Sequence, residues 1–212
     1  MNGLVDDGNN STCPNPNLNP NGNKRRYEDD IADQLLHVPI GHHYLILYPD
    51  IETMRKVYAS YVKKQLEEQP DSIVLFLSYY DTTDNVRHVL SSHGVPVEEH
   101  EKNGTMIILD IMKVIQSSLF EVPDIEKLEF AKKTEQQFEN KTIFIIADMS
   151  VFNHLHKPSE LLEYEKTLHK DLKVERWKEL CLHNKRDFEI MFTKDESNRL
   201  MEYHKDKVII MN

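Results

Sequence analysis

Short, almost uniformly apolar runs alternate along this chain with segments whose apolar side chains recur at helical spacing. The runs are too short for stable helices and lack the polar alternation of a half-exposed strand, so they predict strands that are buried on both faces. They comprise residues 42–48, 72–80, 105–109 and 141–147. Because helical segments separate them, we predict an α/β fold, a three-layer α/β/α sandwich with a mainly parallel central sheet.

The helical segments begin and end at recognisable signals. Asp50 can cap a helix that extends to Pro70, and Gly94 can end a helix over residues 84–93. Thr193 and Glu196 have the spacing of a capping box for a helix that ends near residue 203. The other predicted elements are a helical or irregular stretch at 111–119, helices at 123–138 and 158–172, a weaker strand at 177–183 and a terminal strand at 208–211.

The N-terminal segment has a different composition from the rest of the chain. Residues 1–23 contain eight Asn, three Pro and three Gly but few large aliphatic side chains. The free energy gained by burying so few side chains cannot offset the conformational entropy that the segment would lose on becoming ordered. Basic residues 24–26 and acidic residues 28–30 follow, which is typical of a solvated linker or of a contact site for a partner. We therefore predict a disordered tail over residues 1–34 and a single folded domain over residues 35–212.

Composition and charge narrow the function classes. The chain has 26 basic and 36 acidic residues, a net charge of −10, which argues against direct binding to nucleic acid or to an anionic membrane surface. The longest apolar runs have five residues, whereas a membrane-spanning helix needs about 20. No secretory signal is visible and only two cysteines are present. We therefore expect a cytoplasmic protein.

An acidic residue lies within two positions of the end of each of the four predicted strands. These residues are Asp50, Asp81, Asp110 and Asp148. Parallel strands end at one edge of a sheet, and ligands of open α/β sheets bind beyond that edge, so these carboxylates could together hold a metal ion or a cationic or hydrogen-bonding ligand. The alternative is that Asp50 and Asp81 cap the helices that follow them.

The signatures of nucleotide binding are missing. Residues 143–148 resemble the magnesium-binding strand of phosphate-loop enzymes, but neither Gly-x-x-x-x-Gly-Lys-Ser/Thr nor Gly-x-Gly-x-x-Gly occurs in the chain. Between the first strand and helix the chain reads Tyr48-Pro49-Asp50, and an acidic junction of this kind would repel phosphates.

Other catalytic and metal-binding patterns are weak. The closest histidine clusters are the pair His42 and His43 and the pair His154 and His156, without His-Glu-x-x-His or Cys-x-x-Cys, so we predict no metal site and no cofactor. Cys181, with His183 and Asp187 as potential partners, is more typical of a buried structural cysteine than of a nucleophile. Ser78 has no nucleophile elbow around it.

The order of the elements resembles the MEDS family, a sensory domain named for methanogens, methylotrophs and the DcmR regulator. The resemblance spans residues 36–212, and its motifs are the strand at 43–48 that enters a helix without a phosphate loop, the Ala-Asp-Met end of the 143–149 strand, the segment 160–165, the Leu180-Cys181 strand and the closing segment 200–204. It implies a RecA/KaiC-like domain that has lost the phosphate loop and senses small organic compounds. The family's Cys-x-Tyr-Asp pattern is replaced by Cys181-Leu182-His183-Asn184, which affects the expected ligand preference.

Together these observations predict a non-catalytic sensory or regulatory domain. Its ligand would be a small organic compound or a partner protein at the carboxyl edge of the sheet. A separate signalling or transcription-regulating protein would pass on the signal. The domain could also form an oligomer. Two alternatives stay open: a residual KaiC-like ATPase in which Asp148 holds magnesium and Glu165 acts as base, and a pure interaction subunit. The predicted ligand-binding residues are Tyr48, Tyr79, Tyr80, Asp81, Asp110, Asp148, Glu165 and Cys181.

Overall fold

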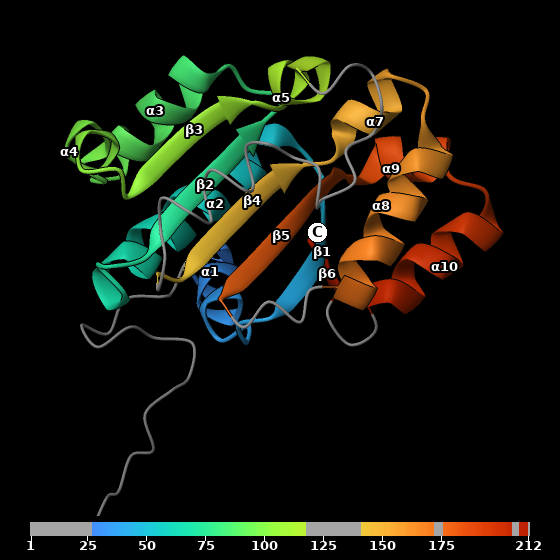
Figure 1. Ribbon diagram of the computed structural model, residues 1–212, viewed down its shortest axis with the longest axis horizontal. Coiled ribbons are helices and arrows are strands. Elements are labelled where there is room, and N and C mark those ends of the chain that lie inside the picture. The colour runs from blue at the N-terminus through green and yellow to red at the C-terminus, as the bar shows by residue number, and fades with distance from the viewer. Residues whose placement is uncertain (1–26, 118–140, 172–175, 205–207, 212) are drawn as a thin grey trace, which may run out of the picture.

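The computed structural model describes residues 27–117, 141–171, 176–204 and 208–211. Its helices and strands follow one another in the order shown in Figure 1: α1 (Tyr27–Leu36), β1 (His42–Tyr48), α2 (Ile51–Glu68), β2 (Ile73–Ser78), α3 (Thr83–Ser92), α4 (Val97–Lys102), β3 (Met106–Asp110), α5 (Ile111–Ser117), β4 (Ile143–Asp148), α7 (Ser150–His154), α8 (Pro158–Asp171), β5 (Trp177–Asn184), α9 (Lys185–Met191), α10 (Lys194–His204) and β6 (Val208–Ile210). The helix predicted at 123–138 lies outside the described residues.

The six strands form one sheet in the order β3-β2-β4-β5-β1-β6, and each neighbouring pair is parallel. This confirms the predicted α/β fold, and the strands predicted at 177–183 and 208–211 both belong to the sheet. β5 lies between β4 and β1, and its side chains are buried from Trp177 to His183. A central strand is buried on both faces, which explains why the sequence of β5 does not alternate between apolar and polar residues.

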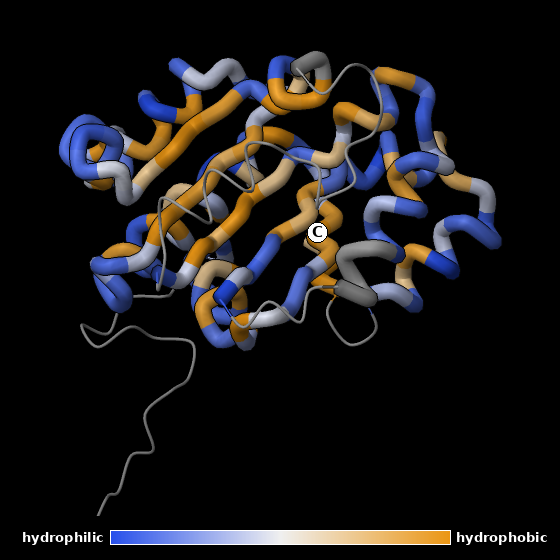
Figure 2. Tube along the Cα trace, viewed as in Figure 1, coloured by the Kyte–Doolittle hydropathy of each residue, from blue (hydrophilic) through white to orange (hydrophobic). Residues whose placement is uncertain are grey.

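Alternating side chains of the strands supply two separate cores. Ile46 and Tyr48 of β1 face a core shared with α1, α2, α3 and α4, whereas Leu45 and Leu47 face a core shared with α5, α7, α8, α9 and α10. Figure 2 shows the apolar strands running through the middle of the molecule between these helices. The result is the predicted three-layer sandwich, with helices on both faces of the sheet.

The helix signals in the sequence are confirmed with one correction. Asp50 accepts a hydrogen bond from the backbone N–H of Thr53 (2.8 Å), and Thr193 and Glu196 form the predicted capping box. Gly94 follows α3 with a φ of 85°, a backbone conformation that residues other than glycine rarely adopt. Thr82, and not Asp81, caps α3, which leaves the Asp81 carboxylate for other partners.

The ordered domain begins earlier than the sequence predicted. Residues 27–34, assigned to the tail, belong to α1, whose Ile31, Ala32 and Leu35 are buried. The Lys178 ammonium group donates a hydrogen bond to the carbonyl oxygen of Leu36 (3.1 Å) and so anchors the C-terminal end of α1 to β5. Residues 1–26, the rest of the predicted tail, lie outside the described residues.

Within the described part of the chain, no helix has both the length and the apolar character needed to cross a membrane.

Candidate functional site

The structure separates the predicted site residues into two groups. The tyrosines and aspartates lie at the carboxyl edge of the sheet, either as the last residue of β1, β3 or β4 or in the segment directly after β2. Glu165 and Cys181 instead lie fully buried between the sheet and α8. The edge placement predicted for these two residues was therefore wrong, because Cys181 lies three residues before the end of β5, on the face that α8 covers.

Asp148 links two neighbouring segments at the carboxyl edge. Its carboxylate accepts hydrogen bonds from the backbone N–H groups of Tyr80 (2.9 Å) and Ser150 (3.1 Å). Only 6% of the residue is exposed, and burial raises the pKa of Asp148 from its usual value to about 6, although the hydrogen bonds to Ser150 oppose the shift. Asp148 is thus partly protonated in mildly acidic solution and holds the loop after β2 against the end of β4.

Asp81 lies at the same edge but belongs to an ion pair. The Arg55 guanidinium donates two hydrogen bonds to its carboxylate (3.1 and 2.5 Å), and Asn85 donates a third (2.7 Å). Burial alone would raise the pKa of Asp81, but the hydrogen bonds from Arg55 and Asn85 outweigh burial and lower it. Asp81 is therefore ionised and committed to contacts within the protein.

The solvent-facing part of this edge is aromatic and acidic. Tyr80 is 47% exposed, and its hydroxyl donates a hydrogen bond to Asp187, at the start of α9. The Tyr79 ring lies 5.4 Å from the Tyr80 ring and 5.6 Å from the ring of His154, between ring centroids. We define Tyr79, Tyr80, His154 and Asp187 as the aromatic edge. The sequence analysis did not include Asp187 among the ligand-binding residues, although its position just after β5 indicates the same edge of the sheet.

The two remaining predicted residues at the edge are less available to a ligand. Tyr48 is buried on the α2 face, where burial raises the pKa of its phenol well above the usual range. Asp110 accepts a hydrogen bond from the backbone N–H of Met112 (2.9 Å) and thereby supports the start of α5. Its strand, β3, is separated from β4 by β2, so Asp110 and Asp148 contact different parts of the edge.

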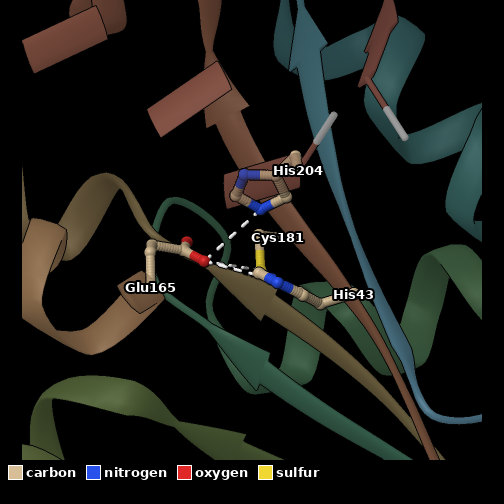
Figure 3. Close-up of side chains that lie close together, drawn as sticks. All are labelled: His43, Glu165, Cys181 and His204. Atoms are coloured by element: carbon tan, nitrogen blue, oxygen red, sulfur yellow. Dashed lines mark hydrogen bonds and ion pairs between the residues drawn. The ribbon is translucent and has the colours of Figure 1, made fainter. Parts of the chain in front are cut away.

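A second group of polar side chains lies inside the protein, between β1, β5, α8 and α10. We call His43, Glu165, Cys181 and His204 the buried cluster (Figure 3). Glu165 is its centre: one carboxylate oxygen, Oε2, lies 3.3 Å from Nδ1 of His43, 3.4 Å from Nε2 of His204 and 3.8 Å from Sγ of Cys181. The sequence analysis missed this arrangement, because residues from four elements form it.

Sheet register and helix position explain why these side chains meet. In the parallel pairing of β1 with β5, His43 is opposite Glu179 and Leu45 is opposite Cys181, so His43 and Cys181 are diagonal neighbours on one face of the sheet. α8 and α10 contribute Glu165 and His204 to the same face. Of the two histidine pairs in the sequence, His42–His43 contributes His43 to this cluster, whereas His154 and His156 are exposed.

Burial controls the ionisation of this region. It raises the pKa of the Cys181 thiol well above its usual value and lowers the pKa of the nearby His183 to about 4. For Glu165, burial would raise the pKa, but the charge and hydrogen bonds of His204 and His43 outweigh it and hold the pKa well below its usual range. A carboxylate anion in the core therefore requires positive charge from its neighbours.

Comparison with protein families identifies the domain. The model described as MEDS, for MEthanogen/methylotroph, DcmR Sensory domain, matches residues 42–204, more than half of the chain. The chain belongs to the MEDS family. The match extends from β1 to the end of α10 and includes the carboxyl edge from Tyr48 to Asp187 as well as the whole buried cluster.

Solved structures show that this MEDS domain shares its fold with KaiC-like proteins. A KaiC-like protein from the archaeon Pyrococcus horikoshii is 17% identical, with a TM-score of 0.52, over 69% of this chain and 62% of the archaeal one. The MEDS chain thus spans less than two thirds of that protein. An uncharacterized protein from the same organism, in complex with an unknown peptide, is 14% identical, with a TM-score of 0.56 over 87% and 82% of the two chains. A comparison with curated proteins gives no match.

Proposed function

We propose that this MEDS domain is a non-enzymatic sensor that binds a small organic compound with a cationic or hydrogen-bond-donating group at the aromatic edge. The observation that carries the proposal is the contact between Tyr80 and Asp187, which joins a partly exposed aromatic ring to a carboxylate from a distant part of the chain. Aromatic faces attract organic cations, and a carboxylate fixes the orientation of a donor group.

The helix start after β1 supports a ligand other than a nucleotide. In nucleotide-binding α/β proteins, phosphates are bound by the free N–H groups at a helix N-terminus. Here the Asp50 carboxylate accepts hydrogen bonds from both the N–H and the hydroxyl of Thr53 (2.8 and 2.9 Å), and so occupies the N-terminus of α2 with negative charge. Asp81, Asp148 and Asp187 add further acidic groups at this edge.

The position of Glu165 supports the non-enzymatic interpretation. A KaiC-like ATPase with Asp148 on magnesium would need a base that reaches the nucleotide. Glu165 contacts His43, Cys181 and His204 in the interior, and its side chain has no exposed surface. A partner peptide is a second candidate ligand, because the archaeal structural neighbour was crystallised with an unknown peptide and Tyr80 offers an exposed anchor.

A titration distinguishes these functions. We expect methylated amines to raise the melting temperature in a saturable way, and we expect Asp187→Asn to weaken their binding about tenfold, or about 1.4 kcal/mol. Asp195→Asn, which changes an exposed aspartate on α10, is the matched control and should bind like the wild type. A saturable response to ATP with magnesium, or no response to amines together with capture of a peptide, would overturn the proposal.

A further inference from the structure

We propose that the buried cluster of His43, Glu165, Cys181 and His204 is a four-ligand site for a divalent transition-metal ion, with zinc as the best fit. The two imidazole nitrogens, the thiol sulfur and one carboxylate oxygen all lie within 4.8 Å of one another, and all four residues are buried. This site is separate from the aromatic edge, so the inference does not depend on the proposed ligand.

The three separations that involve the Glu165 carboxylate oxygen match the edges of a tetrahedral site, and all four donor atoms lie within 4.8 Å of one another. Zinc bonds of about 2.0–2.3 Å place neighbouring ligand atoms at the corners of a tetrahedron with edges of about 3.3–3.8 Å. The carboxylate oxygen Oε2 of Glu165 lies 3.3, 3.4 and 3.8 Å from the donor atoms of His43, His204 and Cys181. The longest distance belongs to sulfur, as the longer zinc–sulfur bond requires.

The histidine at the end of α10 has the orientation of a metal ligand. Nδ1 of His204 lies 2.8 Å from the carbonyl oxygen of Leu200, so it must carry the hydrogen and donate it. The lone pair of a neutral imidazole is then on Nε2, which faces the carboxylate oxygen of Glu165. Two lone pairs that face each other in the core need a cation between them, and ligand histidines commonly donate their other N–H to a backbone carbonyl.

Charge balance also favours a divalent ion. The rings of His43 and His204 lie 4.3 Å apart, so protonation of both would place two like charges in contact inside the protein. A divalent ion with one thiolate, one carboxylate and two neutral imidazoles gives a site with no net charge. A neutral site avoids most of the desolvation cost of a buried charge. On binding, the Cys181 thiol releases its proton to solvent.

The ligand set selects the class of metal. Magnesium and calcium prefer oxygen ligands, whereas thiolate and imidazole favour zinc and its neighbours in the transition series. Four protein ligands fill a tetrahedral zinc ion and leave no place for water or substrate, which is typical of a structural site. The ion would connect α8 and α10 to β1 and β5.

Cobalt substitution and metal analysis test the proposal. We expect the purified full chain to hold about one zinc per molecule, and the cobalt form to absorb as a tetrahedral site with a thiolate-to-cobalt band. Cys181→Ala should remove the thiolate band, and His204→Gln should weaken metal binding at least tenfold. Cys13→Ala, which changes the other cysteine of the chain, should leave the spectrum unchanged.

The wild-type measurement decides the outcome whether or not the variants fold. If the wild type, after incubation with zinc or cobalt and removal of free metal, holds much less than one equivalent and shows no thiolate band, the cluster contains a proton in place of a metal and the proposal is overturned. A thiolate band that persists in a folded Cys181→Ala variant and disappears in Cys13→Ala would overturn the assignment of the ligands.

Discussion

At the scale of single residues, Asp81 and Asp148 show how neighbours set the behaviour of one side-chain type. Both lie at the same edge of the sheet, Asp148 as the last residue of β4 and Asp81 just after β2, and both are buried. Arg55 compensates the charge of Asp81, whereas Asp148 accepts hydrogen bonds from neutral backbone N–H groups and so retains most of the burial effect. The pKa of one carboxyl group is lowered and that of the other is raised.

The raised pKa of Asp148 predicts a pH-dependent contribution to stability. The folded state holds the Asp148 proton up to a pKa of about 6, against 3.8 for the usual value, so this contribution is full below pH 4 and is lost as the pH rises through 6. We expect the difference in unfolding free energy between the wild type and Asp148→Asn to fall by about 1–3 kcal/mol over that interval. Urea titrations between pH 4 and about pH 7 measure it.

The decisive quantity in that experiment is how the difference in unfolding free energy between the two proteins changes with pH. The Asp148→Asn substitution would place an amide NH₂ group against one of the two backbone donors and so lower stability at every pH, because a carboxylate accepts at both oxygens whereas an amide accepts at one. The charged groups near Asp148 include Asp81, whose pKa is already low and which therefore stays ionised over most of the interval. Parallel curves for the two proteins would contradict the prediction.

The Arg55–Asp81 ion pair predicts an unequal effect of two similar substitutions. Arg55→Met leaves a buried carboxylate without its guanidinium, so we expect the unfolding free energy to fall by about 1–3 kcal/mol. Arg87→Met removes ion pairs with the more exposed Asp84 and Glu101 and should cost less than about 1 kcal/mol. Urea denaturation of both variants gives the comparison, and equal losses would show that the Asp81 pair is solvated.

At the scale of elements, the N-terminal helix α1 is part of the core and not a linker. Its apolar positions Ile31, Ala32 and Leu35 pack with residues of α2 in the core on that face. Ser60 and Lys64 of α2 form hydrogen bonds with Asp29, and Lys64 also pairs with Asp33. The predicted domain boundary was too late because the acidic residues at 28–30 and the preceding basic cluster resembled a solvated linker.

Truncation of one α1 side chain tests its contribution. Leu35 has no exposed surface, so Leu35→Ala should lower the unfolding free energy by about 2–5 kcal/mol through lost burial and a cavity. Gln34→Ala, at an exposed position one residue earlier, should change it by less than about 0.5 kcal/mol. A similar small loss in both variants, measured by thermal or urea unfolding, would place α1 outside the cooperative core.

Sequence reasoning was successful where a local signal determines the structure. The strands, Asp50 as a cap and the capping box at Thr193 depend on residues close together in the chain. The helices α4, α7 and α9 have five to seven residues, too few to show an apolar period. The buried cluster could not be predicted, because its four residues meet only once β1 pairs with β5 and α8 and α10 pack on the sheet.

At the scale of the whole molecule, strand order predicts where the fold is most resistant to opening. β4 and β5 are the two central strands of the sheet, whereas β3 and the three-residue β6 are its outermost strands. We expect backbone amides of Leu180 to Leu182 to exchange with solvent most slowly and those of β6 much faster, as measured by hydrogen–deuterium exchange. Fast exchange in β5 would show that the two halves of the sheet open independently.

The pairing of β1 also constrains how a growing chain can fold. β1 is made early, but both of its neighbours, β5 and β6, come from residues 177–184 and 208–210. β2 and β3 can pair soon after synthesis, whereas β1 must wait for most of the chain to leave the ribosome. During that interval its apolar side chains are exposed, so folding on the ribosome should be limited by the arrival of β5.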